Sequence, residues 1–247
     1  MGRILNFKTP LYDDISIEST WLSEYGVYIA GTDGIRLSVL PSQSTNSTKI
    51  VGLAGEAFIG TSYDSRVLQL PAYIKDIDTL DEFKKLLMFD KPKWFHFKNT
   101  GTKIKGIVRN EIIVRPHGRE GTFDMELFCP DPHFYESNPT SKEFNNPTTI
   151  LFYNDGNKES LPNYEVTGKG TVHIGVNGIV MTLEFDTGAY ETLVVNTRNR
   201  EVIKGTSENR LFSNINYTFP KLAIGTNTIA VTGDCTKLKI TPNSRWL

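Results

Sequence analysis

The chain has 247 residues, of which 27 are Lys or Arg and 28 are Asp or Glu, and its formal net charge is −1. Proteins that hold the nucleic-acid backbone, and peripheral membrane proteins of the polybasic kind, need a surplus of basic residues, so this balance excludes both classes. Divided after Tyr135, the chain carries 16 basic and 17 acidic residues before the cut and 11 of each after it, so neither half is a charged module. A hydrophobic content of 38% excludes global disorder.

The N-terminal half begins with short apolar stretches separated by turn residues. Residues 25–40 contain two apolar stretches on either side of Gly31-Thr-Asp-Gly34, which predicts a hairpin. Residues 41–49 are polar and predict a flexible loop. Strand-like composition returns in residues 49–74, and later in residues 93–99, 104–116 and 122–130.

One segment of this half has helical periodicity. Leu80, Phe83, Leu86 and Leu87 recur at helical intervals, and Thr79 with Glu82 has the spacing of a capping box. Because a Lys-Pro pair follows at residues 91 and 92, the pattern predicts a helix over residues 79–89. The apolar stripe is narrow, so we expect one face to pack on a sheet while the other faces solvent or a neighbouring subunit.

A boundary is predicted near the middle of the chain, where residues 129–147 contain four prolines. We therefore expect a first domain over residues 1–135, a linker over 136–147 and a second domain over 148–247. The second domain shows no helical period but many short strand-like runs with turns rich in Asn and Gly, which is typical of an antiparallel sandwich or barrel. These runs are residues 148–154, 163–168, 171–176, 179–185, 191–197, 201–205, 227–233 and 236–242.

The expected cellular compartment follows from the absence of membrane-spanning and signal-peptide patterns in the sequence. No stretch approaches the roughly 20 apolar residues of a membrane span, and residues 1–12 lack the apolar core of a signal peptide, so we expect a chain made in the cytoplasm with no membrane partner. Cys129 and Cys235 lie 106 positions apart, and two unpaired thiols suit a reducing compartment.

A search for metal and nucleophile chemistry gives little. His96 and His173 lie in strand-like runs with no second ligand two or four residues away, which favours structural roles. Cys129 and His133 are four residues apart and could touch one metal ion, but Pro130 and Pro132 favour a stiff interdomain elbow with a buried thiol. No nucleophile elbow is present. We therefore predict no catalytic residue, no metal and no cofactor.

Phosphate and carboxylate motifs are equally weak. Gly52-Leu-Ala-Gly55 and Gly168-Lys-Gly170 match neither the P-loop nor the dinucleotide fingerprint, and both are read as bulges or turns. Glu184 and Asp186 would point to the same face of a strand, but no partner carboxylate across a cleft is evident, so a solvated strand end is favoured over a glycosidase pair. The aromatic residues of the second half are scattered, which favours packing over stacking on sugars.

Several segments, in order along nearly the whole chain, resemble one family. The first half contributes Gly34-Ile-Arg36, residues 50–55, residues 63–68 and the predicted helix; the junction contributes Cys129, Pro130, Asp131, Pro132, His133, Phe134 and Tyr135; and the second half contributes residues 152–156, 161–168, 185–188, 219–227 and 242–246. Together they resemble the distal tail protein (Dit) family of long-tailed, non-contractile bacteriophages and related prophages. His133 stands where Tyr is common in that family, which we expect to change packing and not role.

The resemblance implies a mainly β protein: a β-barrel-like or split-sheet N-terminal domain with one α-helix, followed by a galectin-like antiparallel β-sandwich. It implies a structural protein of the virion, located at the phage tail tip and made in the host cytoplasm. Copies of the first domain would form a homo-hexameric ring that joins the tail tube protein to the tail-associated lysin or tail fibre. The tape-measure protein and then DNA in transit would pass through the opening, and a receptor-binding protein is a further possible partner.

Three hypotheses follow. The first is a tail-tip hub without catalysis, in which residues 129–135 form the structural junction between the domains. The alternative is a carbohydrate-binding module, over residues 148–247, that serves adhesion to the host cell wall. A glycoside hydrolase that uses Glu184 is the weakest of the three.

Overall fold

The computed structural model describes residues 12–30, 41–50, 54 and 56–247, and divides the chain into two compact units. We call Leu5–Ser137 the N-terminal unit and Asn138–Trp246 the C-terminal unit. The division falls inside the predicted linker. Most of that linker belongs to the C-terminal unit, because Lys142–Asn145 forms a strand, β13, that pairs with the long strand β20.

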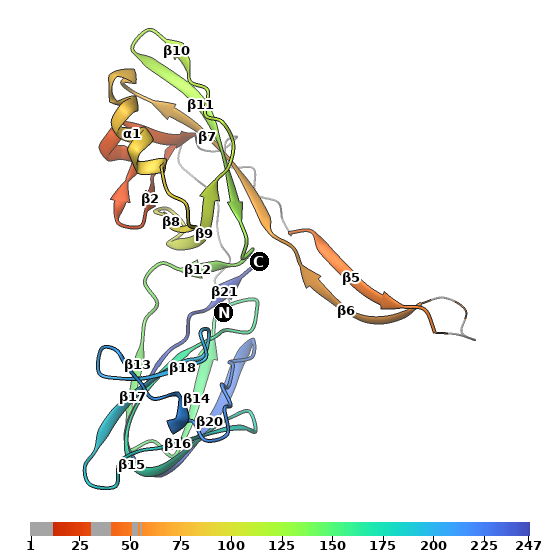
Figure 1. Ribbon diagram of the computed structural model, residues 1–247, viewed down its shortest axis with the longest axis vertical. Coiled ribbons are helices and arrows are strands. Elements are labelled where there is room, and N and C mark those ends of the chain that lie inside the picture. Colours follow the sequence, from red (N-terminus) through yellow and green to blue (C-terminus); the bar gives the residue numbers. More distant parts are fainter. Residues whose placement is uncertain (1–11, 31–40, 51–53, 55) are drawn as a thin grey trace. The chain divides into compact units, whose positions relative to one another are not determined.

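The N-terminal unit is a curled antiparallel sheet with one α-helix beside it (Figure 1). Along the sheet the strand order is β1-β4-β7-β11-β9-β8-β2-β3, with β10 paired to β11 and β12 paired to β9. The strands are β1 Tyr12–Asp13, β2 Ile15–Ile17, β3 Thr20–Trp21, β4 Val27–Ala30, β7 Arg66–Ile74, β8 Lys93–Phe97, β9 Thr102–Val108, β10 Arg115–His117, β11 Glu120–Cys129 and β12 Phe134–Glu136. Two 3₁₀ turns cover Leu22–Tyr25 and Ile77–Thr79, and α1 covers Leu80–Leu87.

Strands β7 and β11 form the core pair of this unit. They run antiparallel from Ile74 opposite Gly121 to Arg66 opposite Cys129, and alternate residues of each strand are buried. A strict two-residue alternation buries one face of a strand and leaves the other for solvent or a second layer. Phe83 of α1 is buried on this core, with its ring 5.6 Å from that of Phe123. The expected packing of the helix on a sheet is confirmed.

The predicted capping box at the start of the helix is wrong. Thr79 is the N-cap residue, but its hydroxyl donates to the carbonyls of Asp76 and Tyr25, at 2.7 and 3.0 Å, and caps no helical N–H. The cause is the 3₁₀ turn that precedes the helix. Asp76 caps that turn through Asp78 N, so Thr79 already has helical backbone angles and its hydroxyl is used locally.

Strands β5 (Gln43–Thr48) and β6 (Ala57–Tyr63) form a separate two-stranded sheet, the β5–β6 arm, which extends from the start of β7 (Figure 1). The prediction of a flexible loop over residues 41–49 covers the whole of β5, and it was wrong. All six residues of β5 are exposed, so the strand has none of the apolar alternation by which a strand is recognised. The turn predicted around Gly31-Thr-Asp-Gly34, and residues 52, 53 and 55, lie outside the described residues.

The C-terminal unit is built on two long strands, β15 (Asn163–Val176) and β20 (Gly225–Thr241), which pair antiparallel over almost their whole length. Their outer halves carry different neighbours: β14 and β16 at one end, β13, β17, β18 and β19 at the other. The remaining elements of this unit are β14 Thr149–Asn154, β16 Ile179–Glu184, β17 Glu191–Asn196, β18 Glu201–Lys204, β19 Glu208–Asn209, a 3₁₀ turn Leu211–Ser213 and β21 Arg245–Trp246.

Glycines bend the two long strands. The register shifts around Gly168 and between Lys169 and Val172, as expected for the bulge predicted at Gly168-Lys-Gly170. Opposite the bulge, Gly233 has φ of 95°, and a Cβ there would lie 2.2 Å from the carbonyl oxygen of Thr171. The sequence analysis predicted two short strands in place of each long one, because glycines occur in both bulges and turns and their presence does not distinguish the two. One hydrophobic cluster joins residues of both halves, including Phe152, Ile174 and Leu193.

The mainly β fold with one α-helix among the described residues is confirmed. None of the described helices is both long and apolar enough to span a bilayer.

Candidate functional site

The predicted junction residues run from Cys129, the last residue of β11, through a hydrogen-bonded turn to Phe134 and Tyr135 of β12. The carboxylate of Asp131 accepts hydrogen bonds from the Tyr135 hydroxyl at 2.6 Å and from the His133 backbone N–H at 3.2 Å, and it lies 2.7 Å from His133 Nδ1. Burial alone would raise the pKa of Asp131, but the hydrogen bonds from His133 and Tyr135 outweigh it and hold the pKa well below its usual range. The turn is therefore fixed by a charged acceptor.

Next to this turn lies a buried cation. Arg66 is 3% exposed, stands opposite Cys129 in the β7–β11 register, and its guanidinium lies 5.1 Å from the centre of the Phe134 ring. Its Nε and Nη2 have no hydrogen-bond partner among the described residues. Burial lowers the pKa of Arg66 and raises the pKa of the Cys129 thiol to about 12. A thiol held protonated is a poor nucleophile and a poor metal ligand.

The histidines considered as metal ligands have structural surroundings. His173 Nδ1 lies 3.0 Å from the Thr182 hydroxyl on the neighbouring strand β16, and burial lowers the pKa of His96 in β8. In the part of the chain that the structure describes, no group of three or more His, Cys, Asp or Glu side chains could hold a metal ion. The Cys129–His133 pair thus gains no third ligand from these residues, and His133 is engaged with Asp131.

The carboxylates near the end of β16 belong to an ion-pair network. Lys204 lies 2.5 Å from Glu191 and 3.6 Å from Asp186, and Arg210 lies 3.6 Å from Glu191 and 3.8 Å from Asp186. Burial would raise the pKa of Glu191, but its hydrogen bond and charge pairing with Lys204 lower it overall. A glycosidase needs one carboxyl with a raised pKa to act as the acid, so this network argues against that chemistry. Glu184 is exposed.

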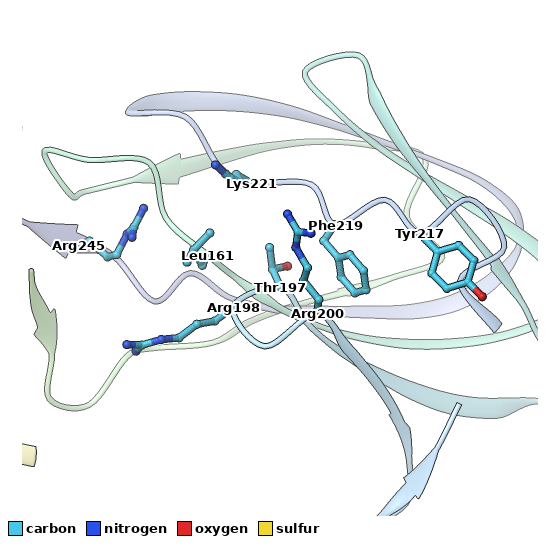
Figure 2. A pocket seen from close by; sticks show the side chains of 8 residues that line it. All are labelled: Leu161, Thr197, Arg198, Arg200, Tyr217, Phe219, Lys221 and Arg245. Atoms are coloured by element: carbon cyan, nitrogen blue, oxygen red, sulfur yellow. The ribbon is translucent and has the colours of Figure 1, made fainter. Parts of the chain in front are cut away.

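A pocket of about 350 Å³ lies in the C-terminal unit, and sequence reasoning did not find it (Figure 2). Its lining residues come from two segments, the turn between β17 and β18 and the segment that precedes β20, and from two single positions. They are Leu161, Thr197, Arg198, Arg200, Tyr217, Phe219, Lys221 and Arg245. In Figure 2, Thr197 lies in the middle with Leu161 and Phe219, Tyr217 lies at one end, and basic side chains lie around the rest.

Hydrogen bonds between side chains and the backbone hold the walls of this pocket in place. The β17–β18 turn is closed by Asn199 N–H, which donates to the Asn196 side chain at 3.1 Å. The segment before β20 is anchored by the buried Tyr164 hydroxyl, which donates to the Pro220 carbonyl at 3.1 Å. Arg245 is oriented by Nε, which donates to the Glu159 carbonyl at 2.8 Å. These hydrogen bonds fix the positions of the lining segments, although the lining residues are far apart in sequence.

A second surface feature is the β5–β6 arm. Its side chains include Phe58 and Ile59, each 68% exposed, and Ser44 and Ser47 are tied to Asp64 and Glu56 by hydrogen bonds. An isolated two-stranded hairpin is marginally stable in water, and large exposed apolar side chains on it favour coverage by another surface. The arm is the strongest candidate for a contact with another chain in the N-terminal unit.

No protein-family model matches the sequence, and no curated protein sequence matches it. Solved structures do. The crystal structure of SPP1 Dit, described as a paradigm of the hub adsorption apparatus in phages that infect Gram-positive bacteria, aligns with a TM-score of 0.73 and 13% identity, covering 95% of this chain and 99% of that one.

Two structures of the phage p2 baseplate in its activated conformation, with Sr and with Ca, align over 92% of this chain and 97% of theirs, with 10% and 8% identity. Their TM-score of 0.44 is too low to support an argument. The SPP1 protein, by contrast, matches both units in one alignment, and the fold of this chain is that of a Dit protein.

Proposed function

We propose that this chain is a distal tail protein: a structural component of a phage tail tip, without catalytic activity. The observation that carries the proposal is the alignment with SPP1 Dit over 95% of this chain and 99% of that one, since a chance likeness of β folds rarely extends through two units in the same order. Because one fold can serve several functions, the proposal needs its own test.

We further propose that six copies close into a ring through the N-terminal unit. In a cyclic ring each interface joins two different surfaces, so an exposed arm on one copy can be covered by a face of the next. The β5–β6 arm, with Phe58 and Ile59 exposed, has the character of such a contact. The hydrogen-bonded turn around Asp131 lies near the end of this unit and serves as the stiff junction toward the C-terminal unit. The C-terminal sandwich, which we expect to be galectin-like, is carried outside the ring.

The ring would join the tail tube to the tail-associated lysin or fibre, and the tape-measure protein and then DNA would pass through its opening. The net charge of −1 supports this role, because a polyanion in transit must slide and must not be held. The particle would be assembled in the host cytoplasm, where the free thiols of Cys129 and Cys235 remain reduced.

Tail assembly tests the hub proposal directly. A nonsense codon early in this gene, placed in the phage genome that encodes it, is expected to yield filled heads without complete tails, and a plasmid copy of the gene should restore them. Particles with normal tails in the absence of the protein would contradict the proposal.

Native mass spectrometry of the purified chain tests the ring. We expect hexamers in the wild type and loss of hexamers in Phe58→Ser. The matched control is Phe212→Ser, because Phe212 is 67% exposed on the C-terminal unit and Phe58 is 68% exposed on the arm. Hexamers retained in Phe58→Ser would exclude the arm as the ring contact and leave the hub proposal to the assembly test.

A further inference from the structure

The pocket of the C-terminal unit concentrates positive charge. Residues 138–246 contain 11 basic and 10 acidic side chains, so the unit as a whole is nearly neutral. Four of the basic ones line the pocket, and no Asp or Glu within the described part of the chain does. Such clustering without a compensating carboxylate in the lining produces a local positive potential, which favours an anionic ligand.

The charges of Lys221 and Arg245 are at most weakly neutralised by their neighbours. Lys221 lies 3.3 Å from the Glu159 carboxylate, in a pair whose two side chains are both more than half exposed, so the pair is weak. Arg245 uses Nε on a backbone carbonyl, which fixes its plane without neutralising its charge. In Figure 2 the guanidinium of Arg200 lies near Thr197 and Phe219, and Lys221 and Arg245 lie farther toward the other end of the pocket from Tyr217. Guanidinium groups bind the oxygens of phosphate in a planar, two-pronged geometry.

A buried hydroxyl supplies an independent sign of a ligand. Thr197 lines the pocket and is only 5% exposed, yet its Oγ1 has no hydrogen-bond partner among the described residues. Buried polar groups in folded proteins are almost always paired, and an unpaired one costs free energy that a ligand atom can recover. Because the oxygen itself is buried, a polar ligand atom in the pocket reaches it only if the side chains that cover it move aside.

The remaining walls are apolar. Leu161 and the ring of Phe219 lie in the middle of the pocket, and the largely exposed Tyr217 lies at one end of it. Aromatic faces pack well against the C–H groups of sugars and polyols. A volume of about 350 Å³ is at the low end of ligand sites, which suits one or two such units and not a folded partner.

We propose that this pocket binds a phosphate-bearing sugar or polyol unit: the phosphate among Arg200, Lys221 and Arg245, a hydroxyl or phosphate oxygen on Thr197 Oγ1, and the carbon skeleton on Phe219 and Tyr217. Nucleic acid carries phosphate too, but its binding needs basic residues along an extended track, and the rest of this unit carries more acidic than basic side chains. The site does not depend on the hub proposal and stands or falls separately from it.

Calorimetric titration of the full chain with sn-glycerol 3-phosphate and with a short glycerol-phosphate oligomer tests the site. We expect saturable binding of both, tighter for the oligomer, and no binding of glycerol, which lacks the charge. Inorganic phosphate is expected to bind more weakly than glycerol 3-phosphate, because it leaves the aromatic walls unused. A dT oligonucleotide that binds as tightly as the glycerol-phosphate oligomer, or no binding of either polyol phosphate at about 10 mM, would overturn the proposal.

Substitutions inside and outside the pocket lining test whether the ligand binds in the pocket. Arg200 has φ of 56°, a conformation that Asn tolerates, so Arg200→Asn removes the charge without new backbone strain. We expect about a tenfold loss of glycerol-phosphate affinity in this variant. The matched control is Lys237→Gln, which removes one charge from β20 of the same unit outside the lining and should leave affinity unchanged. Equal losses in the two variants would indicate diffuse attraction and overturn the site.

Thr197→Val separates a binding role from a structural one. The substitution removes an unpartnered hydroxyl while keeping the shape of the side chain, so the thermal midpoint without ligand should stay the same or rise. The affinity for glycerol 3-phosphate should fall severalfold. Unchanged affinity would exclude the hydroxyl from the site, and a lowered midpoint would show that it serves the fold.

Discussion

Replacing Asp131 by Asn removes the charge that ties together the turn after β11. The carboxylate accepts from the His133 backbone N–H and the Tyr135 hydroxyl and lies 2.7 Å from His133 Nδ1. The side-chain amide of the variant can keep one acceptor but no charge, and hydrogen bonds to a charged group contribute about 1.5–3 kcal/mol each. We expect Asp131→Asn to lower the free energy of unfolding of the N-terminal unit by about 3 kcal/mol at pH 7.

The effect must depend on pH in a defined direction. Because the pKa of Asp131 is depressed in the folded state, its stabilisation is complete above the unfolded pKa of about 3.9 and is lost as the pH falls toward the folded value. The gap between wild type and Asp131→Asn should therefore be constant above about pH 5 and narrow by about 1.4 kcal/mol for each pH unit below about 3.9.

Urea unfolding followed by tryptophan fluorescence measures this gap, since Trp94 packs edge-on against Tyr135 with ring centres 5.4 Å apart. The matched control is Asp124→Asn in β11, where the carboxylate is 58% exposed and lies 3.9 Å from an exposed Arg115. That variant should stay within about 0.5 kcal/mol of wild type. A gap for Asp131→Asn that is equally small at pH 7, or that does not change between pH 7 and pH 3, would refute the reasoning.

Three further outcomes are expected. Arg66→Met should leave the free energy of unfolding unchanged or raise it by about 1–2 kcal/mol in urea unfolding, because the buried guanidinium has unpaired nitrogens; a loss above about 2 kcal/mol would reveal a needed charge. Gly233→Ala should lower the melting temperature well beyond Gly170→Ala, because both glycines have positive φ but only at Gly233 would a Cβ collide with backbone, at Thr171; equal shifts would contradict this. Cys129 should resist alkylation at pH 8 in the folded chain and react at once in urea, because burial raises its pKa to about 12; rapid labelling of the native protein would contradict this.

Local patterns predicted the elements whose burial follows a simple period. Phe83 lies on the apolar stripe of the predicted helix and is the residue of α1 that the core buries. In strands β7 and β11 every second residue is buried, and both strands lie in segments that were recognised as strand-like. In these elements the pattern of neighbouring residues in sequence determines which face is buried, so the element and its buried face can be predicted from a short window of sequence.

The errors occur where distant pairing decides the local structure. The all-polar strand β5 exists because β6 pairs with it, and no periodicity marks it. Gly168-Lys-Gly170 was read as a bulge or a turn, and the predicted strands ended at Gly168 and Gly233, yet both long strands continue, because β15 and β20 pair on both sides of the bulge. Thr79 has the sequence context of a cap, but the preceding turn that Asp76 closes takes its hydroxyl.

The pocket shows a further limit of prediction from sequence, which is that the net charge does not reveal where charges cluster. An overall net charge of −1 excludes a surface that is basic throughout, but it averages over all side chains and conceals a local cluster. Arg198 and Arg200 stand close together in sequence, while Lys221 and Arg245 come from distant segments. The Tyr164–Pro220 hydrogen bond and the bridges from residues 158 and 160 to Arg245 and Leu222 hold those segments in place. A neutral chain can therefore let one polyanion pass and still hold a single phosphate elsewhere, because the first property depends on the sum of charges and the second on their placement.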